Sequence, residues 1–112
     1  MSEITTHVLD TSVGRPAAGV PVTLDAREGA SSWKQLGRGV TDADGRLRDL
    51  SPQPLPAGAY RLTFDTRAYF ESRQTTTFYP EVAIVFELRD AAAKYHVPLL
   101  ISPYGYSTYR GS

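Results

Sequence analysis

Two histidines, His7 and His96, are the only imidazole side chains in this chain of 112 residues. Both fall in segments that read as strands rather than flexible tails, so the fold would hold their rings in place. A neutral imidazole can take a proton from a water molecule as the water attacks a carbonyl group. Hydrolysis by an activated water is therefore the simplest chemistry that these residues permit. Taken singly, each histidine has a plainer interpretation as a surface or hydrogen-bonded strand residue.

An arginine and the end of the chain are further candidates for a site. Arg46 follows Gly45 in a turn sequence, where its forked guanidinium could bind an anionic or carbonyl-rich planar ligand, although most turn arginines are solvated. Residues 104–112 contain three tyrosines, whereas chain ends are normally frayed and polar. A tail that completes an edge strand is the alternative, but it leaves the tyrosines unexplained.

Other catalytic chemistries fit the sequence less well. Zinc requires three or four ligands, and neither an HxH nor an HExxH spacing occurs, so we expect no metal. A Ser-His-Asp triad is compatible with the composition, but no GxSxG motif lies in a strand-turn-helix context. The chain has no cysteine, which excludes a thiolate nucleophile, a disulfide scaffold and a cysteine-bound metal.

Charge and hydropathy limit the kinds of partner. Basic and acidic residues number 12 each, so no overall field favours nucleic acid, an anionic membrane or a strongly acidic partner. No apolar run approaches the ~20 residues that a helix needs to span a bilayer. The N-terminal segment lacks the basic start and apolar stretch of a secretory signal, and we therefore expect a cytoplasmic protein.

Short segments that alternate apolar and polar residues recur along the whole chain, separated by Gly, Pro and Asp. This pattern is typical of an antiparallel all-β domain, and the length fits a single domain over residues 1–112. One short helix is expected at Thr66–Arg73, capped by Thr66, and residues 90–94 could add a helical turn. We expect eight strands packed as a two-sheet sandwich, at residues 5–10, 20–26, 33–41, 46–50, 60–65, 82–88, 94–102 and 107–112.

The alternation also assigns faces to the candidate residues. On a strand, His7 shares its face with Thr5, and His96 shares its face with Leu100. If the larger apolar row of the strand fills the core, His96 points away from it. Leu100 is an unusual choice for open solvent, so a second subunit could cover this face. The sequence Asp42–Gly45 predicts a tight turn that joins two strands closely.

Several segments together resemble 5-hydroxyisourate hydrolase, the enzymatic branch of the transthyretin-like proteins. The resemblance covers the whole chain in order, and the terminal Tyr-Arg-Gly-Ser after an upstream Ser-Pro-Tyr is its most specific part. The sequence has no departure from the family pattern. The matching segments are Thr6–Asp10, Thr41–Arg46, Tyr95–Thr108 and Tyr109–Ser112.

This resemblance implies a fold, an assembly and a set of site residues. The fold is an eight-stranded transthyretin-like sandwich with one short helix. The assembly is a homotetramer, a dimer of dimers whose active sites lie at the dimer–dimer interface. The catalytic residues carried over by motif are His7, Arg46, His96 and Ser112. Because the tail enters the site in this family, the implied substrate-binding residues are His7, Arg46, Tyr109, Arg110 and Gly111.

The implied reaction is hydrolysis of the amide-like N1–C6 bond of 5-hydroxyisourate in urate degradation. It yields 2-oxo-4-hydroxy-4-carboxy-5-ureidoimidazoline and needs no cofactor. We expect His7 to act as the general base, and His96 and Ser112 to orient the water or the ring. Arg46 would stabilise the negative charge that develops on the carbonyl oxygen. The sequence alone does not rank the two histidines as the base.

Two other functions are compatible with a β-sandwich. The first is a non-catalytic small-molecule carrier like vertebrate transthyretin, and the second is a structural or adhesive module. A channel for an apolar hormone gives no reason to keep both histidines, Arg46 and the Arg-Gly-Ser tail. A structural module would predict tandem copies or linkers, which the sequence lacks. The hydrolase is therefore the function that the sequence predicts.

Overall fold

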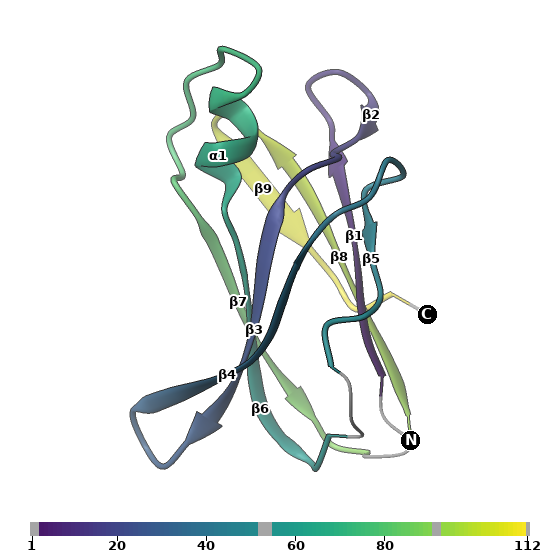
Figure 1. Ribbon diagram of the computed structural model, residues 1–112, viewed down its shortest axis with the longest axis vertical. Coiled ribbons are helices and arrows are strands. Elements are labelled where there is room, and N and C mark those ends of the chain that lie inside the picture. Colours follow the sequence, from purple (N-terminus) through teal and green to yellow (C-terminus); the bar gives the residue numbers. More distant parts are fainter. Residues whose placement is uncertain (1–2, 52–54, 91–92, 112) are drawn as a thin grey trace.

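The protein forms two β-sheets packed face to face, with one short helix at one end (Figure 1). The computed structural model describes residues 3–51, 55–90 and 93–111. Along these residues the elements are β1 Glu3–Asp10, β2 Arg15–Pro16, β3 Pro21–Glu28, β4 Ser32–Val40, β5 Arg46–Leu47, β6 Gly58–Phe64, α1 Thr66–Glu71, β7 Val82–Leu88, β8 Lys94–Ser102 and β9 Gly105–Thr108.

One sheet has the strand order β2-β1-β8-β9, with the short β5 also paired to β1, and the other has the order β4-β3-β6-β7. Every strand pair is antiparallel except β1 and β8, which run parallel over their whole length. That pair departs from the antiparallel domain that the sequence predicts. It lies in the middle of its sheet, where parallel strands are shielded from solvent.

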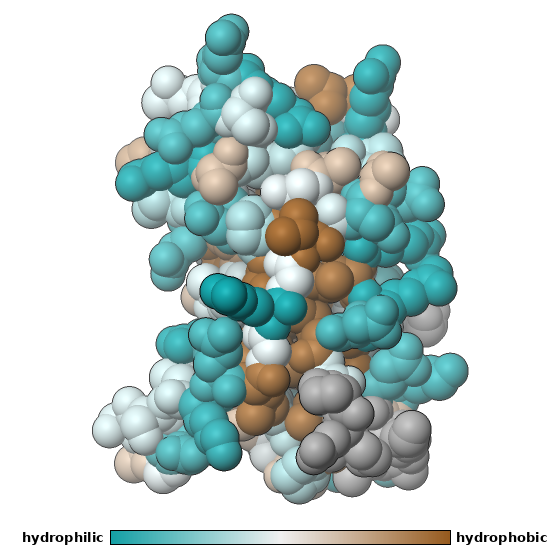
Figure 2. Space-filling view, in the orientation of Figure 1, coloured by the Kyte–Doolittle hydropathy of each residue, from teal (hydrophilic) through white to brown (hydrophobic). Residues whose placement is uncertain are grey.

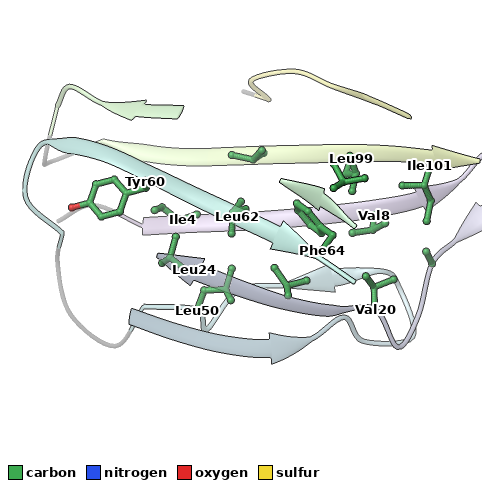
Figure 3. Packing of buried hydrophobic residues seen from close by; sticks show 14 of the residues in the cluster. Ile4, Val8, Val20, Leu24, Leu50, Tyr60, Leu62, Phe64, Leu99 and Ile101 are labelled. Carbon is green, nitrogen blue, oxygen red and sulfur yellow. The ribbon is translucent and has the colours of Figure 1, made fainter. Parts of the chain in front are cut away.

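The core fills the space between the sheets (Figure 3). Alternate residues of β1 and β6 point into it, including Ile4, Val8, Leu62 and Phe64, each at most 1% exposed. This period of two is the one that the sequence predicts for strands with one buried face. The residues between them, His7 among them, therefore lie on the outer face of their sheet.

The two-sheet sandwich and the single helix are confirmed, but several boundaries differ from the expected ones. The strand β2 was not expected, because two residues have no measurable alternation and one of them is proline. The strand expected at 46–50 ends at Leu47. Of the helical turn expected at 90–94, residues 91–92 lie outside the described residues.

The helix begins at Thr66 as expected, but its capping residue and its end differ from the prediction. Asp65, rather than Thr66, caps α1, since its carboxylate accepts a hydrogen bond from the backbone N–H of Ala68. The Thr66 hydroxyl instead donates to the carbonyl of Tyr79. The helix ends at Glu71, two residues before the expected Arg73.

The C-terminal strand expected at 107–112 runs instead from Gly105 to Thr108. After Thr108 the described chain leaves the continuous ladder but stays along the same edge of β8, where Gly111 pairs with His96 in an isolated antiparallel bridge that continues the register of β9. The tail therefore lies against the sheet that carries both histidines.

Hydrophobic side chains are visible down the middle of the view in Figure 2, with hydrophilic side chains on either side. The partly buried hydrophobic residues that pack against the core include Leu36 and Leu47. Among the residues described, no helix is long and apolar enough to cross a membrane.

Candidate active site

Strand register brings the predicted site residues together on the outer face of the β2-β1-β8-β9 sheet. In the ladder between β1 and β5, His7 is the partner of Arg46. In the ladder between β1 and β8, Thr5 is the partner of His96. Gly111 then bridges to His96 from the other side. Pairing between strands thus makes neighbours of residues that are far apart in sequence.

The turn before β5 fixes both Arg46 and the ring of His7. The Asp42 carboxylate accepts hydrogen bonds from the backbone N–H groups of Asp44 and Arg46, at 2.9 and 3.0 Å. The hydrogen bond from the N–H of Arg46 lowers the pKa of Asp42. Burial opposes this effect, and the N–H of Asp44 and the nearby arginine charges add to it. The carbonyl oxygen of Asp44 lies 2.9 Å from Nε2 of His7.

This contact decides where the proton of His7 sits. A carbonyl oxygen can only accept a hydrogen bond, so Nε2 of His7 must carry the hydrogen that points at Asp44. In the neutral ring the other nitrogen, Nδ1, then holds a lone pair. His7 is thereby arranged as an acceptor of a proton at Nδ1.

His96 has a different environment. Its Nδ1 lies 2.8 Å from the hydroxyl oxygen of Thr5. Partial burial lowers the pKa of His96, and electrostatic interaction with the nearby His7 and Arg46 side chains lowers it further. The uncharged form of the ring is therefore favoured.

The C-terminal tail is bound to β8 at three points. The hydroxyl of Thr108 donates to the carbonyl of Pro98 at 2.7 Å, and the N–H of Gly111 donates to the carbonyl of His96 at 2.8 Å. Between them, the guanidinium of Arg110 lies over the ring of Tyr95, 4.6 Å from its centroid, in a cation–π contact.

Gly111 lies directly against the His96 ring. A Cβ atom added to Gly111 would be only 2.6 Å from Cδ2 of His96. No side chain fits in that space without moving the ring or the tail. The absence of a side chain at this position therefore lets the tail reach the imidazole.

A surface hollow links most of these residues. Its cationic side chains, Arg46, Arg48 and Lys94, outnumber its one carboxylate, Glu3, so it suits a polar ligand that carries carbonyl oxygens or negative charge. Thr5, Thr6, Tyr95, His96 and Gly111 complete its lining.

Not every predicted residue lines this hollow in the single chain. Tyr109 and Arg110 line a second hollow with Ile84, Phe86 and Val97, beside β7 and β8. Ser112 lies outside the described residues. His7 is not among the residues that line the first hollow, although it is the ladder partner of Arg46, which is. The parts assigned to all the predicted site residues in catalysis or substrate binding stay predictions.

The HIUase/Transthyretin family model matches residues 4–111. This chain belongs to that family. A 5-hydroxyisourate hydrolase from Salmonella dublin is 47% identical over 110 residues, which cover 97% of this chain and 80% of that protein. The solved 5-hydroxyisourate hydrolase of Klebsiella pneumoniae has a TM-score of 0.87 at 44% identity, covering 100% of this chain and 94% of that one. Transthyretin from Sparus aurata has a TM-score of 0.90 at 34% identity, covering 96% and 95% of the two chains.

Membership of the HIUase/Transthyretin family confirms the transthyretin-like fold that the sequence predicts. The fold does not by itself separate hydrolase from transthyretin, because structures of both superimpose closely on this chain. The residues on the outer sheet face have to make that distinction.

Two contributors to this family site were missed by reasoning from sequence. Thr5 contacts His96 through its hydroxyl, and Asp44 contacts His7 through its backbone carbonyl. The place of Thr5, two residues before His7 and on the same strand face, was a usable signal. A backbone contact such as that of Asp44 leaves no signal in side-chain types.

Within the residues that the structure describes, no three His, Asp or Glu side chains come close enough to share a metal ion.

Proposed function

We propose that this protein hydrolyses 5-hydroxyisourate, opening its six-membered ring in urate degradation. The observation that carries the proposal is that His7, His96 and Arg46 lie on one sheet face, with the two imidazole rings in different hydrogen-bond contacts. It is supported by 47% identity to a protein named 5-hydroxyisourate hydrolase over nearly the whole chain.

In the proposed reaction, His7 is the general base. Its Nδ1 lone pair takes a proton from water as the water oxygen bonds to C6 of the substrate, a step usually worth about 10²- to 10⁴-fold in rate. Arg46 stabilises the negative charge on the C6 oxygen. The C6–N1 bond then breaks, N1 takes up a proton, and C6 becomes the carboxylate of 2-oxo-4-hydroxy-4-carboxy-5-ureidoimidazoline.

The tail completes the proposed site. Gly111 already lies against His96, which leaves the next residue, Ser112, to orient the water or the ring together with His96. Tyr109, Arg110 and Gly111 are proposed to contact the substrate. For Tyr109 and Arg110 this requires a second copy of the chain, because they line a different hollow of their own chain.

We also propose a homotetramer, a dimer of dimers with the outer faces of the β2-β1-β8-β9 sheets turned towards each other. Leu100 is only partly exposed on that face, and Tyr104, at the end of the same sheet, is 71% exposed. Sedimentation velocity should give the mass of four chains of 12.3 kDa. A stable monomer would contradict this assembly. The cytoplasmic location stays a prediction, which cell fractionation checks.

The activity is tested on 5-hydroxyisourate generated freshly by urate oxidase, by following its decay in ultraviolet absorbance. The protein should accelerate the decay, and His96→Ala should lose most of the acceleration. Thr63→Ala is the matched control, since Thr63 lies half-buried on the outer face of the other sheet. Unchanged decay with the folded wild type would reject the hydrolase and favour a non-catalytic carrier.

A further inference from the structure

Thr5 is held beside His96 by the backbone on both sides of it. The two residues are direct partners in the parallel ladder of β1 and β8. The next residue, Thr6, points inward and donates from its hydroxyl to the carbonyl of Val97 at 2.6 Å. This second bond fixes the two strands one position beyond the pair, so the 2.8 Å contact between the Thr5 hydroxyl and His96 Nδ1 does not rest on a loose side chain.

The contact between the Thr5 hydroxyl and His96 Nδ1 is compatible with either direction, because a hydroxyl can donate to a bare Nδ1 or accept from an Nδ1–H. A hydroxyl that donates to Nδ1 requires a lone pair on that nitrogen. A neutral ring must then carry its hydrogen on Nε2, on the side away from Thr5.

We propose that Thr5 is a positioning residue that holds His96 in the tautomer with hydrogen on Nε2. His7 carries its hydrogen on Nε2 as well. It donates that hydrogen to the carbonyl oxygen of Asp44, and its Nδ1 remains an acceptor. The two imidazoles therefore offer opposite groups to a ligand, an acceptor on His7 and an N–H donor on His96. The catalytic consequence rests on the proposed hydrolysis, whereas the tautomer does not.

The donor on His96 has a defined use in that reaction. Ring opening needs a proton acceptor for the attacking water and a hydrogen-bond donor for the carbonyl oxygen or the departing N1. If both histidines presented a lone pair to the ligand, the site would contain two bases. It would then lack the N–H donor of His96. Thr5 divides these two tasks between rings of the same chemical type.

The tautomer is measured directly by long-range proton–nitrogen correlation NMR on the ¹⁵N-labelled protein at pH 8. The chain has only two histidines, so His7→Gln suffices to assign the His96 signals. The wild type should give the pattern of the Nε2–H tautomer for His96. An Nδ1–H pattern in the wild type overturns the proposal whatever the protein catalyses.

Substitution of Thr5 tests its causal role. Thr5→Val keeps the shape and removes the donor, so His96 should populate both tautomers, and kcat should fall about 10- to 100-fold with KM nearly unchanged. Thr5→Ser should restore both the tautomer and the rate. Thr63→Val, an outer-face substitution of the same type on the other sheet, should alter neither.

The possible failures can be told apart. An inactive wild type with the Nε2–H pattern rejects the hydrolase but not the tautomer. An active wild type whose His96 tautomer is unchanged in Thr5→Val shows that Thr5 does not set it. If Thr5→Val does not fold, the wild-type NMR pattern and the Thr5→Ser variant still decide.

Discussion

His7 and His96 lie on one sheet face, yet their surroundings give them different properties. His7 is held by a backbone carbonyl in a charged turn, whereas His96 is held by a threonine hydroxyl and a glycine against its ring. Residue type alone would assign the two imidazoles the same chemistry. Neighbouring groups decide which nitrogen is free and which charge state is favoured.

The titration of His96 should report its surroundings. Burial and the neighbouring positive charges lower its folded-state pKa below the ordinary 6.5. The unfolded chain therefore binds more protons than the folded one as the pH falls below 6.5, and stability drops from there down to the folded-state pKa. Above 6.5 this histidine contributes no pH dependence. NMR titration should place its midpoint below 6.5.

A variant isolates this contribution. His96→Gln should lose less stability than the wild type between pH 7 and 5, measured by urea denaturation, because it has no such group to protonate. A wild-type midpoint above 6.5 would mean that a partner stabilises the charged imidazole instead.

The close approach of Gly111 to His96 gives a second prediction at this scale. In Gly111→Ala, the new Cβ would meet Cδ2 of His96 at 2.6 Å, so ring or tail must move. A displacement of about 1 Å can cost 10²-fold in rate, and we expect kcat/KM to fall about 10- to 100-fold. The free energy of unfolding should change by only about 0.5 kcal/mol, because the tail adds nothing to the core.

Gly105→Ala is the matched control in the same C-terminal segment. Its new Cβ would approach nothing closer than 3.6 Å, the Ser102 hydroxyl, so activity should stay at the wild-type level. Full activity in Gly111→Ala would show that the tail leaves His96 during turnover.

At the scale of elements, the turn from Asp42 to Gly45 decides whether Arg46 meets His7. Gly45 has φ of +76°, and an added Cβ would lie 2.3 Å from the carbonyl oxygen of Val8. The turn can therefore pack against β1 only if this residue has no side chain. The same packing brings the Asp44 carbonyl to His7.

Gly45→Ala should therefore destabilise the protein more than backbone strain alone predicts. Gly29 is the matched control, since its φ is +67° but an added Cβ meets nothing within 4 Å. Gly29→Ala should cost about 1–2 kcal/mol for the left-handed backbone. Gly45→Ala should cost at least about 1 kcal/mol more, measured by urea denaturation. Equal costs would mean that the turn can move off β1 freely.

Alternation of apolar and polar residues predicted most strands to within one or two residues, because one face of each strand is buried. It failed for β2, which is too short to alternate, and for the tail. The sequence after Thr108 suits a strand, but the continuous ladder ends there, Arg110 lies over the ring of Tyr95, and Gly111 pairs with His96 only as an isolated bridge. Such contacts depend on tertiary structure and cannot be inferred from local pattern.

The candidate site was predicted unevenly for the same reason. His7, Arg46 and His96 were identifiable by type and by resemblance, and the structure places them together. The part of Thr5 depends on the register of two parallel strands that are distant in sequence. No spacing rule specifies that register.

At the scale of the whole molecule, a buried hydrogen bond joins the two sheets at the end that carries the helix. The Tyr69 hydroxyl on α1 donates to the Asp10 carboxylate, at the end of β1, at 2.7 Å, and both residues are 2% exposed. Burial, followed by the contact with Asp10, raises the pKa of Tyr69 to about 12. The helix that follows β6 is thereby tied to the opposite sheet.

Tyr69→Phe should lower the free energy of unfolding by about 1–3 kcal/mol, because it leaves a buried carboxylate oxygen without its donor. Thermal denaturation measures the loss. Tyr104→Phe should have almost no effect, since Tyr104 is 71% exposed. Activity per folded molecule at 25 °C should be unchanged in both, and a loss in Tyr69→Phe would mean that this end of the sandwich affects the site.

The parallel pairing of β1 with β8 also has a consequence during protein synthesis. The Thr5–His96 contact spans 91 positions, so the first strand made must wait for nearly the last before the sheet can close. Until then β1 of the ribosome-bound chain is not paired with β8, and His7 is present without His96 beside it. Sheets built on such distant pairings fold in milliseconds to seconds. Catalytic competence should therefore appear only after β8 has left the ribosome, because the ladder that joins β1 to β8 cannot form earlier.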